Sequence, residues 1–285
     1  MHGISVTASV SEQDRHLTDV STIIFGNGRL YSGGDDGKVK VWKPDLSLER
    51  EFQAHPSVVY HLALCGDSLY SCSNDGTVRA WDPNTGDSRG TLLEYDDEVW
   101  RFCVDNGHLY SGDNKGMICS WKQDKQSQLY NLVEEVRDLI VKGQLIYTVR
   151  DRDVVVTELA GDKGRYVTRA TMEGSSPMVM VGDKLCFASR TGTDICVHEN
   201  SKESRFKQLK QYKAHDMILN ALAAVGDATL FSGSWDKTVK RWDLGTFECS
   251  GTCDVGVCVS SLAVGDQGQV YAAGSNGHIC RIDSK

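Results

Sequence analysis

Proline and long apolar runs are both scarce in this chain. Only four prolines stand among 285 residues, against 28 glycines. No stretch approaches the roughly 18 consecutive apolar residues that a membrane-spanning helix needs, and the first ten residues show no basic region followed by an apolar core. Disordered chains usually combine many glycines with many prolines, and long helices contain few of either. The composition therefore favours an ordered chain of extended segments joined by glycine-containing turns.

The motifs that usually mark catalytic or metal sites are also missing. The sequence contains no Cys-x-x-Cys, no His-Glu-x-x-His and no Gly-x-Ser-x-Gly. The glycine-rich run at residues 26–37 lacks the Gly-Lys-Ser/Thr of a phosphate loop, which favours a hairpin instead. Cys249, Cys253 and Cys258 are close in sequence, but their spacing fits no common zinc motif. We therefore predict no enzyme activity, no cofactor and no metal site.

Cysteine usage and net charge limit the compartment and the partners. Ten cysteines without a zinc or disulfide framework favour a reducing compartment, so we expect a cytoplasmic protein, and a nuclear one is also compatible. The formal net charge of −8 argues against nucleic acid and against an acidic membrane surface as partners, because both attract clustered Lys and Arg.

A repeat of about forty residues runs through the chain. Its clearest copies read LYSGGDDGKVKVW, LYSCSNDGTVRAW, LYSGDNKGMICSW and LFSGSWDKTVKRW, and they begin at Leu30, Leu69, Leu109 and Leu230. Weaker copies begin near residues 146, 186 and 270. A steady period of this length marks a repeat architecture, so we predict a single domain over residues 1–285.

Each copy predicts four short strands and no helix. An apolar strand leads into a turn pair such as Asn27-Gly28 or Asn106-Gly107, and a second strand, a polar turn and a third strand follow. A less regular extended stretch leads to the next copy. A β-branched residue recurs at one place in the third strands, which argues for a buried position. These residues are Val39, Val78, Ile118, Val155, Ile195, Val239 and Ile279.

This pattern resembles the WD40-repeat family over essentially the whole chain. The Trp-Asp pair is intact at Trp81-Asp82 and Trp242-Asp243, whereas Trp42-Lys43 and Trp121-Lys122 match only at the Trp. Seven copies imply an all-β, seven-bladed propeller with four antiparallel strands per blade. The last copy lacks an outer strand, and the alternating segment GISVTASV at residues 3–10 could supply it. We expect this N-terminal strand to close the ring, which removes an open sheet edge.

The resemblance also implies a hydrogen-bonded His-Ser-Asp-Trp tetrad in complete repeats. The matching residues are His16, Ser32, Asp36 and Trp42 in the first repeat, His55, Ser71, Asp75 and Trp81 in the second, and His215, Ser232, Asp236 and Trp242 in the sixth. Tyr95 and Lys115 replace His and Asp in the third repeat. Glu158, His198 and Ile282 replace the terminal Trp in the fourth, fifth and seventh repeats. We expect packing, rather than the tetrad, to hold those four blades.

Aromatic residues outside the repeat pattern mark a candidate binding surface. Trp100 takes the place of Tyr60 near the start of a first strand, and Trp235 precedes Asp236 in a turn. In WD40 propellers both places lie at the top face, around the mouth of the central channel. The counterparts of Tyr60 are Ser21, Arg137 and Asn220, and those of Trp235 are Asp35, Asn74 and Asn114. Aromatic and Arg side chains over a polar rim are typical of binding hot spots. The alternative is that Trp100 packs against the neighbouring blade and Trp235 is an isolated surface residue.

Two charged segments suggest the sign of the partners. Acidic residues Glu94, Asp96, Asp97 and Glu98 adjoin Trp100, which favours a basic peptide at the top face. The connection at residues 202–213, KESRFKQLKQYK, is basic and includes Phe206 and Tyr212. It favours docking of an acidic partner there, and a solvated outer strand is the alternative.

These observations together predict a non-catalytic, monomeric scaffold that binds a protein or peptide through its top face. One alternative is a substrate-recognition subunit of a ubiquitin ligase. However, Asn84 and Gly245 stand where adaptor-docking repeats of this family have Arg. An enzyme with a site at the central channel is the alternative from another class, and the missing catalytic motifs disfavour it.

Overall fold

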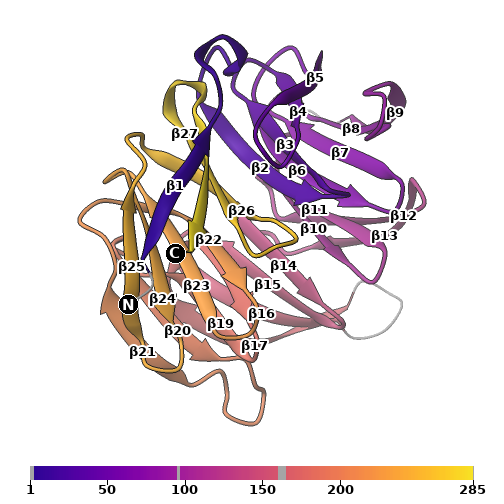
Figure 1. Cartoon of the computed structure of the whole chain (residues 1–285). Helices are drawn as coiled ribbons and strands as arrows, with labels where there is room; N and C mark the ends of the chain where they lie inside the picture. Colours follow the sequence, from indigo (N-terminus) through magenta and orange to yellow (C-terminus); the bar gives the residue numbers. More distant parts are fainter. Residues whose placement is uncertain (1–2, 95–96, 160–164, 285) are drawn as a thin grey trace.

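The computed structural model describes residues 3–94, 97–159 and 165–284. Seven four-stranded antiparallel sheets follow one another around a ring (Figure 1), so the predicted seven-bladed β-propeller is confirmed. The described helical segments are two single 3-10 turns, η1 (Glu12–Asp14) and η2 (Ser275–Gly277). No helix in the described ranges is long and apolar enough to cross a membrane.

The first four blades each contain four strands that are consecutive in the chain. Blade 1 contains β2 (Val20–Gly26), β3 (Arg29–Gly34), β4 (Lys38–Trp42) and β5 (Leu48–Gln53). Blade 2 contains β6 (Val59–Cys65), β7 (Ser68–Ser73), β8 (Thr77–Trp81) and β9 (Ser88–Glu94). Blade 3 contains β10 (Val99–Asp105), β11 (His108–Asp113), β12 (Met117–Lys122) and β13 (Lys125–Asn131). Blade 4 contains β14 (Asp138–Lys142), β15 (Leu145–Arg150), β16 (Asp153–Leu159) and β17 (Tyr166–Glu173).

The remaining three blades complete the ring. Blade 5 contains β18 (Ser175–Val181), β19 (Lys184–Ala188), β20 (Asp194–Glu199) and β21 (Gln208–Lys213). Blade 6 contains β22 (Leu219–Val225), β23 (Thr229–Ser234), β24 (Thr238–Asp243) and β25 (Glu248–Asp254). Blade 7 contains β26 (Val259–Val264), β27 (Val270–Gly274) and β28 (Ile279–Ser284), with β1 (Ile4–Ser9) as its outer strand.

Strand β1 closes the ring as the sequence predicts. It pairs antiparallel with β28, from Ile4 opposite Ser284 to Ser9 opposite Cys280. Figure 1 shows the indigo β1 beside the yellow C-terminal segment, so the two ends of the chain share one blade. Ile4 is buried against the core between blades 6 and 7, which gives the strand an apolar anchor as well as its ladder of hydrogen bonds.

The hydrophobic core is divided into layers between neighbouring blades. Each terminal Trp packs toward the preceding blade: Trp81 lies with residues of blades 1 and 2, and Trp121 with residues of blades 2 and 3. Such layers bury one face of each sheet against the next, so no blade needs a core of its own.

One recurring glycine has a packing role rather than a turn role. Gly33 and Gly233, in the second strands of blades 1 and 6, face a Val of the next blade's first strand. A Cβ at Gly33 would lie 2.6 Å from Val59 Cγ1, and one at Gly233 would lie 2.5 Å from Val259 Cγ1. The small residue therefore lets adjacent blades approach closely.

Strand pairing corrects two of the predicted repeat boundaries. In blade 4, Ile146 pairs with Thr157, so Thr157 and not Glu158 takes the place of the terminal Trp. Val154, rather than Val155, is therefore the equivalent of Val39. The cause is a tighter turn, because Arg150 pairs directly with Asp153 across two residues. In blade 5, Leu185 pairs with His198, which moves that repeat's anchor one residue earlier than 186.

Candidate functional site

Four polar side chains of blade 2 form one hydrogen-bonded chain, which links strands β7 and β8 to the loop before β6 and to the turn after β7. Trp81 Nε1 donates to Ser71 Oγ at 2.8 Å, and Ser71 Oγ lies 2.7 Å from His55 Nε2. His55 Nδ1 lies 3.0 Å from Asp75 Oδ2. A neutral imidazole with its proton on Nδ1 satisfies all four groups, since the serine hydroxyl then donates to Nε2.

Blades 1 and 6 repeat this arrangement. The His Nε2 to Ser Oγ distance is 2.7 Å and the Trp Nε1 to Ser Oγ distance is 2.8 Å in both blades. The groups are His16, Ser32, Asp36 and Trp42 in blade 1, and His215, Ser232, Asp236 and Trp242 in blade 6. The structure therefore brings together all twelve predicted tetrad residues in three sets of four.

Burial and hydrogen bonding shift the pKa values of these groups. Burial lowers the pKa of His55 and His215, and the hydrogen bonds to Asp75 and Asp236 oppose that shift only in part. Burial alone would raise the pKa of Asp36, but donors from His16 and the backbone outweigh it and hold the pKa at about 2. The tetrads of blades 2 and 6 thus combine neutral imidazoles with ionised carboxylates near neutral pH.

Blade 4 holds a polar network that the sequence pattern does not reveal. Arg150 is buried, and it donates from Nε to Thr148 Oγ1 at 2.9 Å and from Nη2 to Thr157 Oγ1 at 3.2 Å. The threonines take the places of the tetrad Ser and Trp. Blade 4 has no tetrad, and in addition to the packing between blades a guanidinium links its second and third strands. The Arg and Thr residues of this network differ in type from the His, Ser and Trp of the tetrad. A search for the tetrad motif therefore does not find the network.

The third and fifth blades are held in other ways. Lys115, in the place of the tetrad Asp, forms an ion pair with Asp97 at 2.6 Å, and its predicted partner position Tyr95 lies outside the described residues. In blade 5, the ring of His198 stacks on Phe187 with centroids 5.0 Å apart, and His198 Nδ1 contacts Phe206 O at 2.8 Å.

The top face is defined here by the turns between second and third strands together with the loops that precede the first strands. A backbone hydrogen bond joins these two segments in several blades, for example from Asn114 N to Glu98 O at 3.1 Å and from Trp235 N to Ile218 O at 3.0 Å. The two sets of predicted binding positions therefore lie at the same end of the blades.

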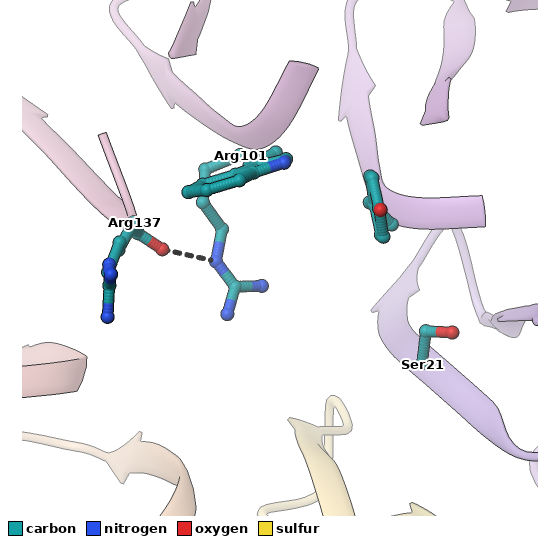
Figure 2. Close-up of a pocket in the computed structure, with 5 residues that line it drawn as sticks. Ser21, Arg101 and Arg137 are labelled. Carbon is teal, nitrogen blue, oxygen red and sulfur yellow. Dashed lines mark hydrogen bonds between the residues drawn. The ribbon is translucent and has the colours of Figure 1, made fainter. Parts of the chain in front are cut away.

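A hollow of about 410 Å³ on the top face is lined by Ser21, Tyr60, Trp100, Arg101 and Arg137 (Figure 2). These residues come from four successive blades, at the start of β2, β6 and β10 and just before β14. Three of the predicted binding residues thus meet in one place. Trp100 is half-buried and lines the hollow, so part of its surface is open to a ligand.

Glu98 fixes the two aromatic side chains of this hollow. Its Oε2 accepts hydrogen bonds from Trp100 Nε1 at 2.8 Å and from Tyr60 Oη at 3.2 Å. Burial, followed by the nearby Glu98 charge, raises the pKa of Tyr60, so the phenol remains a donor at neutral pH. The rings are therefore held in position before any ligand arrives.

Arg101 is the residue of this site that the sequence reasoning missed. Its Nε donates to Arg137 O at 3.2 Å and lies 3.7 Å from Asp138 Oδ1, and the side chain is 29% exposed. A hollow of about 220 Å³ in the central channel is also lined by Arg101 and Ser21, so the two spaces adjoin. The sequence feature that could have indicated Arg101 is its charge, because the residues around it at the start of β10 are apolar.

The other predicted top-face residues lie apart from this hollow. Asn220 lines the central channel, and its Nδ2 donates to Val259 O at 3.2 Å. Trp235 is 45% exposed and adjoins exposed Met217 and Ile218 of the same blade. Asn74 is exposed on blade 2, and Asn114 is half-buried on blade 3. The structure thus separates a pocket over blades 1–4 from an apolar patch on blade 6.

The two charged segments differ in how their charges are used. In the acidic segment, Asp97 pairs with Lys115 and Glu98 binds the two aromatic donors, whereas Asp96 lies outside the described residues. In the basic segment, Arg205, Lys207 and Lys210 are exposed, but Phe206 is buried in the core between blades 4 and 5. Tyr212 packs against Trp242 in a tilted arrangement, with ring centroids 4.9 Å apart. The aromatic residues therefore do not contribute a face to the basic surface.

The cysteines are mostly buried strand residues. All ten have free thiols, and burial raises the pKa of Cys196 to about 11 and that of Cys280 to about 12. Among the described residues, no cluster of three or more His, Cys, Asp or Glu side chains has the geometry to hold a metal ion.

The family model "WD domain, G-beta repeat" matches residues 8–43, 46–82 and 206–243. These segments contain the first three strands and the tetrads of blades 1, 2 and 6. The protein is thus a seven-bladed β-propeller in which three segments match the WD40-repeat family model. Propellers of this class generally act as protein-interaction scaffolds.

Relatives among curated proteins are distant. The chain is 25% identical over 146 residues to zinc finger CCCH domain-containing protein 62 of Arabidopsis thaliana, which covers 50% of this chain and 35% of that protein. It is 24% identical over 286 residues to ribosome biogenesis protein YTM1 of Eremothecium gossypii, which covers 93% of this chain and 54% of that protein. The matched region therefore spans between about a third and about half of these relatives.

Proposed function

We propose that this propeller is a non-catalytic scaffold that binds a peptide segment of a protein partner in the hollow between Tyr60, Trp100 and Arg137. The observation that carries the proposal is the pair of partly exposed aromatic rings that Glu98 holds over a space of about 410 Å³. Rings fixed in advance lose little conformational entropy on binding, which is the property of binding hot spots. No catalytic motif adjoins them.

The apolar patch on blade 6 supports a second point of contact. Met217, Ile218 and Trp235 are each more than two-fifths exposed and lie on the same face as the hollow. Exposed apolar residues gathered in one place mark interaction sites more often than residues scattered singly. A folded partner could cover both places, whereas a short peptide would use the hollow alone.

Affinity capture from cell extract tests this proposal. The full chain is compared with Trp100→Ala, Trp235→Ala and the control Leu129→Ala, which truncates an exposed side chain on outer strand β13. We expect Trp100→Ala to lose most of the captured partner, and Leu129→Ala to retain it. If all four proteins capture the same partners in equal amounts, the top face is not the binding surface.

The charge of a ligand at the top face depends on which charged side chains there are not already paired within the protein. The acidic segment favours a basic peptide. However, Asp97 and Glu98 already bind donors of this chain, which leaves less negative charge for a ligand than the sequence suggests.

A second docking surface is proposed on the outer rim of blade 5. Arg205, Lys207 and Lys210 are exposed, and within the described part of the chain no carboxylate pairs with them, whereas Lys202 pairs with Glu158. Three unpaired cations on a chain of net charge −8 favour an acidic partner segment. We also propose an intracellular location, which ten free thiols support.

A further inference from the structure

We infer that the hollow over blades 1–4 binds a carboxylate side chain of the partner, an Asp or a Glu, through the terminal nitrogens of Arg101. The inference rests on the proposed top-face binding and specifies the chemistry of its ligand. It is the opposite of the basic peptide that the sequence favours.

Arg101 is held in place by a main-chain contact. Its Nε donates to the main-chain oxygen of Arg137, which fixes the plane of the guanidinium group. Figure 2 shows this bond and shows the two terminal nitrogens of Arg101 directed toward the open space between Arg137 and Ser21. A guanidinium that is already oriented loses little freedom when it binds an anion.

The acceptors around this guanidinium bind other donors. Asp138 is the nearest carboxylate, but its Oδ1 accepts from Leu139 N at 2.9 Å and its Oδ2 from Met178 N at 2.8 Å. The distance of 3.7 Å from Arg101 Nε to Asp138 is too long for a hydrogen bond. Asp138 therefore lies near the guanidinium without using its terminal donors.

The other carboxylates near the hollow are also occupied. Glu98 accepts from Trp100 and Tyr60, and Glu135 pairs with Arg137 at 2.5 Å. No acceptor among the described residues binds Nη1 or Nη2 of Arg101. The available hydrogen-bonding capacity of this hollow is therefore a pair of donors, although its formal charges nearly cancel.

The geometry of the free donors limits the shape of the ligand. Two parallel N–H donors on one guanidinium match the two oxygens of a carboxylate, which is the pairing that gives Arg its specificity. The flanking rings of Tyr60 and Trp100 offer apolar surface for a neighbouring side chain of the same peptide. The ligand that fits is a peptide segment with an acidic residue next to an aliphatic or aromatic one.

Selection from a library of displayed random 12-residue peptides tests the inference, with the full chain as bait. Selected peptides are synthesised with Glu, Gln, phosphoserine or Lys at the enriched position, and their affinity is measured by fluorescence anisotropy. We expect Asp or Glu to be enriched, and the Glu peptide to bind about tenfold tighter than its Gln counterpart. Arg101→Gln should abolish this preference, and Arg101→Lys should retain part of it, because Lys keeps the charge but not the planar fork.

Arg169→Gln on outer strand β17 of blade 4 is the matched control, since it removes an exposed Arg that does not line the hollow, and it should leave the preference unchanged. Tighter binding of the Lys peptide, or a Glu preference that survives in Arg101→Gln, would overturn the inference while leaving top-face binding intact. Clearly tighter binding of the phosphoserine peptide would replace carboxylate by phosphate as the ligand. If no peptide is selected and Trp100→Ala captures the normal partners, the proposed function fails as well.

Discussion

At the scale of single residues, the tetrads could be predicted, whereas the role of Arg101 could not. His55, Ser71, Asp75 and Trp81 match the tetrad that the resemblance to WD40 repeats implies, and they form its hydrogen bonds. Arg101 has no counterpart of its type in any other blade. Its role arises from the main-chain oxygen of Arg137 beside it, and the neighbouring blade that supplies this oxygen becomes adjacent only in the folded ring.

The buried histidines predict that stability falls in mildly acidic solution. The pKa values of His55, His198 and His215 are lowered below the ordinary 6.5, chiefly by burial. The unfolded chain therefore binds protons at a higher pH than the folded chain. The stabilisation is complete above about pH 6.5 and is lost as the pH falls below it, with a slope of at most about 1.4 kcal/mol per pH unit for each histidine.

Urea denaturation at pH 7.5, 6.5 and 5.5 measures this effect. We expect the free energy of unfolding to decrease at pH 5.5, and a further decrease below pH 4, where Asp36, whose pKa is about 2 in the folded protein, becomes protonated in the unfolded chain. A free energy that is constant or rises between pH 7.5 and 5.5 would contradict the assignment of neutral, buried imidazoles.

At the scale of strands and turns, the existence of each strand was easier to predict than the length of the turn that follows it. Turn pairs and apolar alternation located every blade, but blade 4 was aligned one residue out because its hairpin between Arg150 and Asp153 is tighter than in the other blades. Hairpin length changes the register without changing composition. The close approach of Gly33 to Val59 was equally hidden, because it depends on how one blade faces the next.

The outer strand of blade 7 predicts a large effect of an N-terminal deletion. Removing residues 1–11 deletes β1, exposes the edge of β28 and uncovers the pocket that Ile4 fills beside Gly251. Circular dichroism should show a markedly lower melting temperature, because a ladder of hydrogen bonds and a buried side chain are lost together.

Ser9→Ala serves as the control for this deletion, because Ser9 is an exposed residue on the same strand. Its melting temperature should match that of the unmodified chain. Equal melting temperatures for the deleted and unmodified chains would show that ring closure does not depend on β1.

At the scale of the whole molecule, the three blades that match the family model are the three that hold a complete tetrad. The ring geometry followed from the number of repeats, whereas the polar network of blade 4 and the stacked rings of blade 5 could not, since each uses residue types absent from the motif. Local stability should differ between blades for this reason.

Hydrogen–deuterium exchange followed by mass spectrometry tests that difference. Opening blade 2 breaks the tetrad as well as the strand ladder, so amides in β7 should exchange about tenfold more slowly than those in β19 of blade 5. Equal protection of β7 and β19 would indicate that packing between blades, rather than the tetrad, determines local opening.

The pairing of β1 with β28 has a consequence for the order of synthesis. The ribosome makes β1 before any other strand of the propeller and β28 after all of them, so the ring cannot close until nearly the whole chain has emerged. Until then β1 has no partner strand with which to pair. If two chains are made close together, the β1 of one can pair with the β28 of the other, since both offer the same edge. Expression at high density should therefore yield some dimers joined by an exchanged first strand, in place of two separate rings.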